Sequence, residues 1–187
     1  MSQAKGLEGV VAADSSVSAI VDSTLMYVGY NIDDLATKAS FEEVVYLLWH
    51  KELPNKEQLA ELKEQLNKEM TIPEEVIEHF KMYPIDKVHP MAALRTAVSL
   101  LGLYDEEAEV MSDEANYRKA IRLQAKVATV VTAFARIRKG LEPVHPKPEY
   151  DYATNFLYML DGEEPEDIAV EAFNKALVLH ADHELNA

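Results

Sequence analysis

Several kinds of chemistry are excluded by what this 187-residue chain lacks. It contains no cysteine, so disulfide bonds, thiolate catalysis and cysteine-ligated zinc sites cannot form. Its six glycines do not cluster into a glycine-rich loop of the kind that holds phosphate groups. No apolar run is long enough to span a lipid bilayer. Among the remaining side chains, imidazole is the one whose proton moves most easily near neutral pH, so histidine is the first candidate for chemistry.

Basic residues are scarce as well. The chain has 18 lysines and arginines against 33 aspartates and glutamates, which gives a net charge of −15. With no basic face to meet phosphate groups, we expect neither a nucleic-acid partner nor an anionic membrane partner. The acidic residues concentrate in 57–78 and 105–114, a pattern typical of solvated helix faces. The amino end shows no secretory signal pattern, and we expect a cytoplasmic location.

The length of the chain suits one domain. The pattern of its apolar and polar residues predicts an all-α fold with a short amino-terminal β-hairpin. β-Branched and aromatic residues fill positions 17–21 and 24–27, and Asp22-Ser23 between them suits a tight turn. The chain after Tyr30 has helical character. Capping residues, prolines and glycines predict helices that begin at or near Ser40, Asn55, Pro73, Pro90, Ser112, Tyr152 and Pro165.

The longest predicted helix runs from Ser112 to Lys139 and is apolar or small nearly all round from Ala125 to Ile137. At 1.5 Å per residue it would be about 40 Å long, more than a domain of this size easily covers alone. Its alanines would allow a partner helix to pack closely. This pattern indicates either a second subunit or further chain.

The last predicted helix, which starts at Pro165 and continues to the chain end, carries the candidate site. At 100° per residue, Phe173, Ala176, His180 and His183 fall within about 40° of one line on the helix surface. Asp182 points roughly the opposite way. The stripe therefore starts as core packing and ends in two imidazoles.

Three interpretations of these imidazoles stay open on residue chemistry alone. His180 and His183, with Glu184 beside them, could hold a metal ion, although the spacing is not that of the zinc-protease motif. The two histidines could instead be hydrogen-bonded polar groups of the core. They could also donate to the carboxylate or carbonyl oxygen of a small anion, with Asn186 adding an amide donor.

Several stretches together resemble one family, the bacterial-type citrate synthases, in order and spacing along essentially the whole chain. The less specific ones lie near the amino end. The most specific is the last. These stretches are V-V-A-A-D-S-S-V-S-A-I, G-Y-N-I-D-D-L-A, S-F-E-E-V-V-Y-L-L-W, H-P-M-A-A-L-R-T-A-V-S-L-L-G, G-L-E-P-V, N-F-L-Y-M-L-D-G-E-E-P and L-H-A-D-H-E-L-N-A.

The resemblance implies that residues 1–187 are the amino-terminal portion of a large helical domain, with the small domain and carboxyl-terminal part absent. Acetyl-CoA and oxaloacetate would be substrates of the full-length parent, with no cofactor and no metal. By motif, His183 matches the histidine that binds oxaloacetate, and His180 and Asn186 match flanking positions. The family's main catalytic histidine and aspartate come later, so the fragment itself is expected to be inactive.

The resemblance leaves two further functions open and adds an expectation about assembly. It does not separate citrate synthase from 2-methylcitrate synthase, which would take propionyl-CoA. A non-enzymatic helical self-association module is the competing class. The helices from Pro90 and Ser112 resemble those of the family's dimer interface, which implies a homodimer. Two positions depart from the family pattern: Val28 stands where we expect arginine, and Lys51 where we expect glycine.

Overall fold

The computed structural model describes residues 15–183, and its chain starts with a small antiparallel sheet. Strands β1 (Ser18–Val21) and β2 (Thr24–Tyr27) form the predicted hairpin, and β3 (Tyr30–Asn31) adds a third strand beside β2. Asp22 and Ser23 have φ angles of 48° and 66°. Two consecutive positive φ angles give the turn whose twist matches that of the strands. The hairpin is confirmed, whereas the third strand was not predicted.

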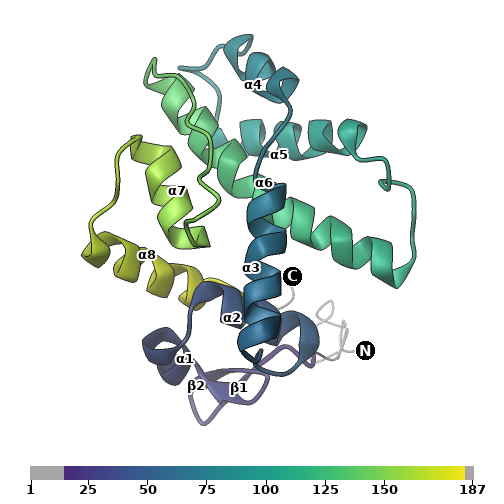
Figure 1. Ribbon diagram of the computed structural model, residues 1–187, viewed down its shortest axis with the longest axis vertical. Coiled ribbons are helices and arrows are strands. Elements are labelled where there is room, and N and C mark those ends of the chain that lie inside the picture. The colour runs from purple at the N-terminus through teal and green to yellow at the C-terminus, as the bar shows by residue number, and fades with distance from the viewer. Residues whose placement is uncertain (1–14, 184–187) are drawn as a thin grey trace, which may run out of the picture.

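Helices make up most of the remaining chain, which confirms the predicted class (Figure 1). All predicted helix starts lie within two residues of observed ones, and only the end of the last helix differs substantially. A short helix after β3 had not been predicted separately. The helices are α1 (Ile32–Lys38), α2 (Phe41–His50), α3 (Lys56–Glu69), α4 (Glu74–Lys81), α5 (Pro90–Leu101), the 3-10 turn η1 (Gly102–Tyr104), α6 (Asp113–Arg138), α7 (Tyr152–Asp161) and α8 (Asp167–Leu179).

Local hydrogen bonds explain why the early helices begin where they do. The Ser40 backbone N–H donates to Glu43 Oε2 at 2.7 Å, and the Glu43 N–H donates back to Ser40 Oγ at 3.3 Å. Asn55 and Gln58 make the same reciprocal pair at the start of α3. Each pair satisfies two backbone groups that a helix start would otherwise leave exposed. Both helix starts were predicted and are confirmed.

Helix α6 runs through the centre of the molecule, and α3, α4, α5 and α7 all pack against it (Figure 1). No residue from Ala125 to Ile137 is exposed, as the sequence predicted. The buried hydroxyls on this stretch are satisfied, because Thr129 donates to Met70 O at 2.6 Å and Thr132 donates to Ala128 O at 3.0 Å. The helix therefore carries polar groups through the core without leaving them unpaired.

Two hydrophobic clusters share this helix. One joins β2, α1, α2, α3, α7 and the first half of α6, with Tyr27, Leu47 and Met159 fully buried. The other joins α4, α5 and the second half of α6, where the Phe80 and Phe134 rings meet edge to face at 5.5 Å. The first cluster also includes Val178 of α8. Burial of this side chain fixes the helix that leads to the candidate histidines.

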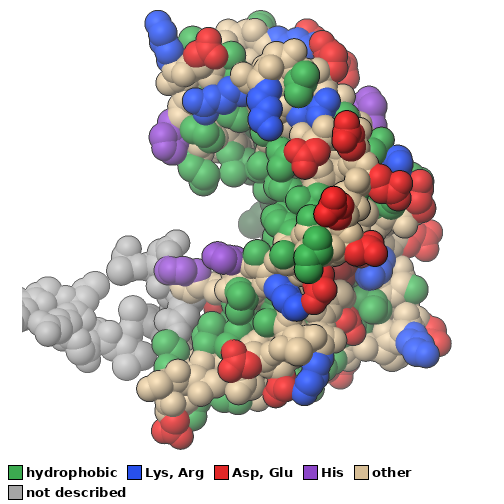
Figure 2. Space-filling view, turned by 90° about the vertical axis from the view of Figure 1, so that its left-hand side faces the viewer, with side chains coloured by type: hydrophobic (Ala, Val, Ile, Leu, Met, Phe, Trp, Pro, Cys, Tyr) green, Lys and Arg blue, Asp and Glu red, His purple; other side chains and the backbone are tan. Residues whose placement is uncertain are grey.

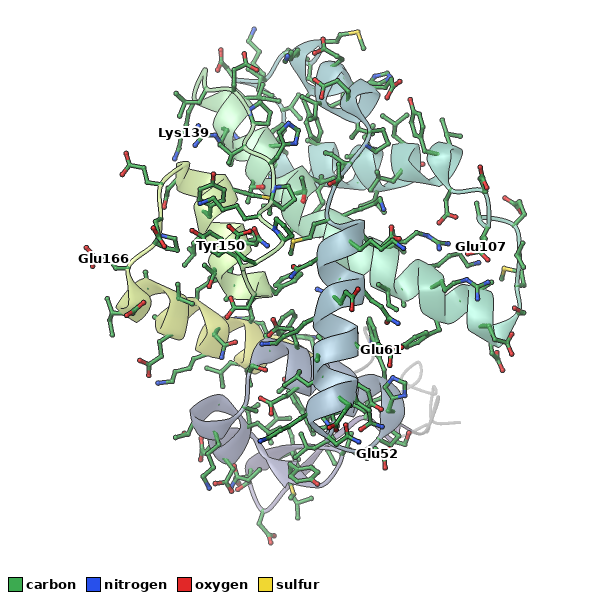
Figure 3. The ribbon with its side chains drawn as sticks, in the orientation of Figure 1. Glu52, Glu61, Glu107, Lys139, Tyr150 and Glu166 are labelled. Carbon is green, nitrogen blue, oxygen red and sulfur yellow. The ribbon has the colours of Figure 1, made fainter. Side chains whose placement is uncertain are left out.

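The proline-containing segment between α6 and α7 forms neither helix nor strand, as predicted. Asn155 is fully buried on α7 and binds this segment through its side-chain amide. Its amide oxygen accepts from the Lys147 N–H at 2.8 Å and its amide nitrogen donates to Lys147 O at 2.8 Å. Tyr150 lies in the same segment, in front of α7 (Figure 3). One amide side chain thus replaces the backbone pairing that the segment lacks.

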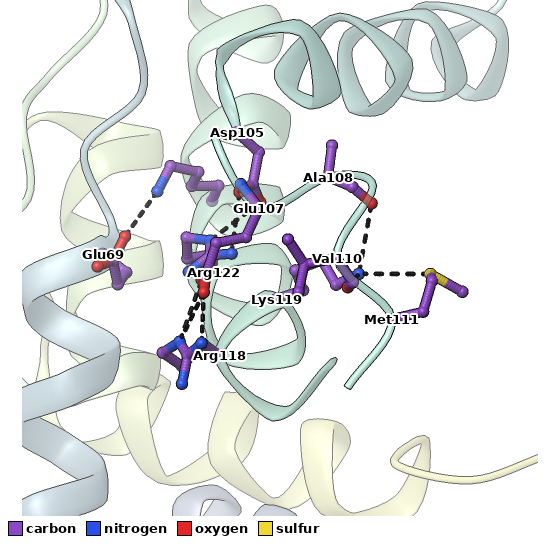
Figure 4. A network of polar contacts seen from close by, with 10 residues as sticks. Glu69, Asp105, Glu107, Ala108, Val110, Met111, Arg118, Lys119 and Arg122 are labelled. Atoms are coloured by element: carbon purple, nitrogen blue, oxygen red, sulfur yellow. Dashed lines mark hydrogen bonds and ion pairs between the residues drawn. The ribbon is translucent and has the colours of Figure 1, made fainter. Parts of the chain in front are cut away.

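The acidic stretches behave in two ways. Glu61 on α3 is exposed, as expected for a solvated helix face (Figure 3). Asp105 and Glu107, in contrast, lie on the loop before α6 and are half-buried against arginines. Arg122 bonds Asp105 and Glu107, and Arg118 bonds Glu107 through both oxygens (Figure 4). The prediction of a solvated helix face is wrong here, because these carboxylates fasten a loop to α6.

Within residues 15–183, no helix is long and apolar enough to cross a membrane. The longest, α6, carries four arginines and two lysines along its length, so charged side chains interrupt its apolar residues. Its burial comes from the helices that pack around it.

Lys51 ends α2 in the left-handed conformation, with φ 66° and ψ 14°. This is the position at which the resemblance leads us to expect glycine, and glycine is the residue that adopts this conformation without steric cost. We expect Lys51→Gly to raise the free energy of unfolding by about 0.5–1 kcal/mol, net of the greater unfolded-state entropy of glycine. Chemical denaturation monitored by circular dichroism would measure it.

The matched control is Glu64→Gly, at an exposed position in the middle of α3. That backbone is helical, so glycine should lower the free energy of unfolding by about 1 kcal/mol. Two variants that shift stability in the same direction would contradict the conformational explanation.

The ion pairs of Glu107 predict part of the acid sensitivity of the fold. Hydrogen bonds from Arg118, and then from Arg122, lower the pKa of Glu107 from 4.5 to about 2. Because the folded pKa lies below the unfolded one, the stability these pairs add is complete above about pH 4.5 and is lost as the pH falls towards 2. In Glu107→Gln, the melting temperature should therefore fall less across that pH window than in the wild type.

Thermal unfolding at a series of pH values would test this. Glu109→Gln is the control, since Glu109 is exposed in the same loop. Parallel melting curves for wild type and Glu107→Gln would show that the ion pairs do not contribute to the acid response.

Candidate functional site

Helix α8 ends at Leu179, and the two candidate histidines lie at and beyond its end. His180 is the C-cap residue, with φ −111° and ψ 9°, and the following residues up to His183 are not helical. The prediction that this helix continues to the chain end is therefore wrong for the described part. The angular argument that put His180 and His183 on one stripe fails with it, since it requires helical geometry at every step.

The apolar stripe expected on α8 is only partly buried. Phe173 stacks on Phe156 of α7, with ring centroids 4.6 Å apart, but Phe173 and Ala176 are both half-buried. Val178 is the α8 residue that is fully buried, and it was not part of the predicted stripe. Helix α8 therefore packs on the core through one face, where Phe173 meets α7, and much of its remaining surface is exposed.

His180 is exposed and turns back onto its own helix. Its ring Nδ1 lies 2.7 Å from Ala176 O. A carbonyl oxygen can only accept, so Nδ1 carries the proton and Nε2 faces outward as an acceptor in the neutral ring. The same carbonyl also accepts from the His180 backbone N–H at 3.2 Å, so the ring adds a second bond at the end of α8. His180 therefore has a structural role at the helix end, next to the site.

His183 is exposed too, and it is the last residue that the structure describes. In the described part of the chain, both imidazoles therefore lie at the surface and not in the core. Glu184 and Asn186 lie outside the described residues. Among residues 15–183 no group of three or more acidic or histidine side chains is placed to hold a metal ion. The structure thus presents an accessible imidazole at His183.

Asp182, between the two histidines, is bound by the amino-terminal hairpin. Ser18 Oγ donates to Asp182 Oδ2 at 2.5 Å. The Tyr27 hydroxyl donates to the Asp182 carbonyl at 3.2 Å and accepts from the Asp182 N–H at 3.3 Å. Burial raises the pKa of Tyr27, against the Asp182 backbone hydrogen bond, which lowers it. Ser18 and Tyr27 were not predicted as part of the site, because partners more than 150 residues apart leave no local pattern in the sequence.

One face of the molecule is hollowed between an upper and a lower part (Figure 2). Hydrophobic side chains form the floor of this hollow, and histidine side chains stand on its lower edge. The outer rims are charged, with acidic and basic side chains interspersed. A concave apolar surface bordered by imidazoles can enclose a small molecule or receive further protein.

A separate cavity of about 580 Å³ lies between α5 and α6. Its basic residues already have partners in the protein. Arg122 bonds Asp105, Lys126 bonds Glu69 at 2.9 Å, and Lys119 donates to Val110 O at 2.7 Å (Figure 4). None of its lining residues belongs to α8 or to positions 180–183. It is therefore distinct from the histidine site.

Comparison with known proteins decides the family. Residues 6–187 match the sequence profile of the family described as "Citrate synthase, C-terminal domain". The chain belongs to the citrate synthase family. The resemblance inferred from the motifs is therefore confirmed, while the assignment of residues 1–187 to the amino-terminal portion of the large domain stays a prediction.

Curated relatives extend the match over the whole chain. Citrate synthase 2 of Bacillus subtilis (strain 168) is 69% identical over 187 residues, which are 100% of this chain and 50% of that protein. The citrate synthase of Haloferax volcanii is 46% identical over 98% of this chain and 50% of its own length. A 2-methylcitrate synthase of Mycobacterium tuberculosis is 39% identical over 98% of this chain and 46% of its own length. The chain thus spans about half the length of the curated relatives it matches.

Solved citrate synthases share the fold. The enzyme from Pyrobaculum aerophilum superposes with a TM-score of 0.88 at 36% identity, over 96% of this chain and 47% of that one. The enzyme from Thermoplasma acidophilum was solved in a ternary complex with carboxymethyl coenzyme A and oxaloacetate. It superposes with a TM-score of 0.90 at 27% identity, over 98% of this chain and 48% of that one. The helices therefore adopt the overall arrangement of these citrate synthases.

Proposed function

We propose that this chain is part of a citrate synthase and that it supplies the group that holds oxaloacetate. The observation that carries the proposal is the 69% identity to citrate synthase 2 of Bacillus subtilis along the entire chain. The motif L-H-A-D-H-E-L-N-A marks His183 as the oxaloacetate-binding residue. Its exposure at the carboxyl side of α8 leaves it accessible to a substrate.

His183 would act by holding and polarising oxaloacetate. An imidazole N–H donates to the keto oxygen of oxaloacetate and withdraws electron density, so the carbonyl carbon becomes a better electrophile. In the complete protein, the enol of acetyl-CoA would attack that carbon, and hydrolysis of the thioester would release citrate and CoA. Acetyl-CoA is then a substrate, and no cofactor is required. The main catalytic histidine and aspartate would lie outside these 187 residues.

Two other functions are weaker. A 2-methylcitrate synthase would use propionyl-CoA in place of acetyl-CoA, and the 39% identity to such an enzyme is well below the 69% to a citrate synthase. A non-enzymatic helical module would use the exposed helix faces and would have no use for His183. The response of substrate binding to a change at His183 separates this module from the enzyme.

Replacing His183 tests the proposal in the longest form of the protein that its gene encodes. Isothermal titration calorimetry with oxaloacetate should show a Kd about 10–100 times higher for His183→Ala, the loss expected for one hydrogen bond to a polarised oxygen. Succinate has the same two carboxylates without the keto group. The wild-type preference for oxaloacetate over succinate should therefore disappear in His183→Ala.

The control is His145→Ala, since His145 is an exposed histidine on the segment before α7. It should bind both diacids as the wild type does. Unchanged oxaloacetate affinity in His183→Ala would sink the proposal and favour the interaction module. Turnover of acetyl-CoA and oxaloacetate by residues 1–187 alone would show that the catalytic groups are not outside this chain.

We further propose that the chain forms a homodimer through α5 and α6, the helices that the resemblance places in the family's interface. Large apolar side chains are exposed on and between these helices. Met91 is 63% exposed on α5 and Leu123 is 43% exposed on α6, while Leu103 and Met111 in the connection are 81% and 77% exposed. Burying such side chains against a second copy would release water from apolar surface.

The dimer can be tested with one substitution in this surface. Leu103→Lys places a charge where the partner would pack, so it should raise the dimer dissociation constant at least tenfold in sedimentation velocity experiments. Ile168→Lys, at a 68% exposed position on α8, is the control and should leave the dimer unchanged. A wild-type chain that sediments as a monomer at every concentration would contradict the proposal.

A further inference from the structure

The backbone just before His183 is fixed from two directions. On one side, the end of α8 holds it, because the Ala181 N–H donates to Val178 O at 3.3 Å and His180 bonds Ala176 O. On the other side, the hairpin holds Asp182. Consecutive Cα atoms are about 3.8 Å apart across a planar peptide, so a fixed Asp182 leaves His183 little freedom beyond rotation about two backbone bonds.

The Tyr27 hydroxyl binds both polar backbone atoms of Asp182. It donates to the carbonyl oxygen at 3.2 Å and accepts from the N–H at 3.3 Å. Ser18 binds the side chain of the same residue at 2.5 Å. Three atoms of Asp182 are thereby held by two hydroxyl groups, which determines the orientation of the peptide that leads into His183.

The two hydroxyls come from a rigid support. Ser18 and Tyr27 are directly opposite each other in the β1–β2 register, so their side chains project from the same face of the hairpin. The Val28 N–H donates to Val17 O at 2.8 Å and closes the ladder beside this pair. Tyr27 is fully buried in the main cluster, so its hydroxyl cannot move independently of the core.

We infer that Tyr27 and Ser18 are positioning residues that set the orientation of His183 towards the keto group of oxaloacetate. This inference rests on the proposed role of His183. It assigns a positioning function to the amino-terminal hairpin. Folding of the hairpin onto residue 182 is then a condition for a competent site.

Tyr27→Phe removes the hydroxyl and keeps the buried ring. We expect the Kd for oxaloacetate to rise about tenfold, the effect of two ordinary hydrogen bonds, while the Kd for succinate stays within about twofold of the wild type. Isothermal titration calorimetry on the longest native form measures both constants. The ratio of the two is the informative quantity, because a general loss of structure would weaken both diacids.

Substitutions at Ser18 provide a second test in case Tyr27→Phe disturbs the core. Ser18→Ala should raise the Kd for oxaloacetate severalfold, and Ser18→Thr, which keeps the hydroxyl, should restore it. Tyr30→Phe is the matched control. Tyr30 pairs with Tyr27 across β2 and β3 but is 42% exposed, so loss of its hydroxyl should leave the Kd unchanged.

The outcomes separate this inference from the function beneath it. If His183→Ala loses the preference for oxaloacetate while Tyr27→Phe and Ser18→Ala keep it, the hairpin does not position the site and the inference is wrong. If His183→Ala itself has no effect, the proposed function fails first. Equal loss of oxaloacetate and succinate affinity in Tyr27→Phe would also overturn the inference, because positioning of His183 affects only the keto group.

Discussion

Burial of helix α6 is the constraint on which the rest of the structure depends. Four helices from both sides of it in the sequence pack around it, and both hydrophobic clusters include its residues. A helix enclosed in this way cannot move without displacing all of its neighbours, because protein interiors are close-packed. Small residues at positions such as Ala125, Ala128 and Ala133 allow those neighbours to approach closely. The segments that carry chemistry are attached to this framework and take their positions from it.

The candidate site is attached through a path that joins the two ends of the chain. Val178 brings α8 into the main cluster, and Asp182 then meets the hairpin formed by residues 18–27. A binding residue on a non-helical segment needs such support, because a backbone outside a helix or sheet has no regular hydrogen bonds to keep it in place. Hydroxyl groups on the amino-terminal hairpin, which is anchored by the buried Tyr27, supply that support here. The arrangement also explains how an exposed histidine can be well oriented, because the residues before it are fixed although its own side chain is exposed.

Local chemistry accounts for the predictions that are confirmed. Ser40 with Glu43, Asn55 with Gln58, and Pro90 mark helix starts through bonds or steric effects within one turn, and the structure has all three. Predictions that depended on distant contacts were less accurate. The expected helix to the chain end stops at Leu179, where the His180 ring and the hairpin provide better partners for the backbone than a further turn would. Asp105 and Glu107 were expected to be solvated, and they bind arginines more than ten residues away.

The sequence alone determined the helical class, the hairpin turn, the burial of α6 and the family, because each depends on residue spacing that a linear pattern records. Its motif also singled out His183. The tertiary structure decided how that histidine is presented: outside the helix, exposed, and next to a residue held by Ser18 and Tyr27. The physical reason is that hydrogen bonds between residues 18–27 and residue 182 form only after α8 and the hairpin have packed on the same core. No periodicity in the chain encodes such a contact.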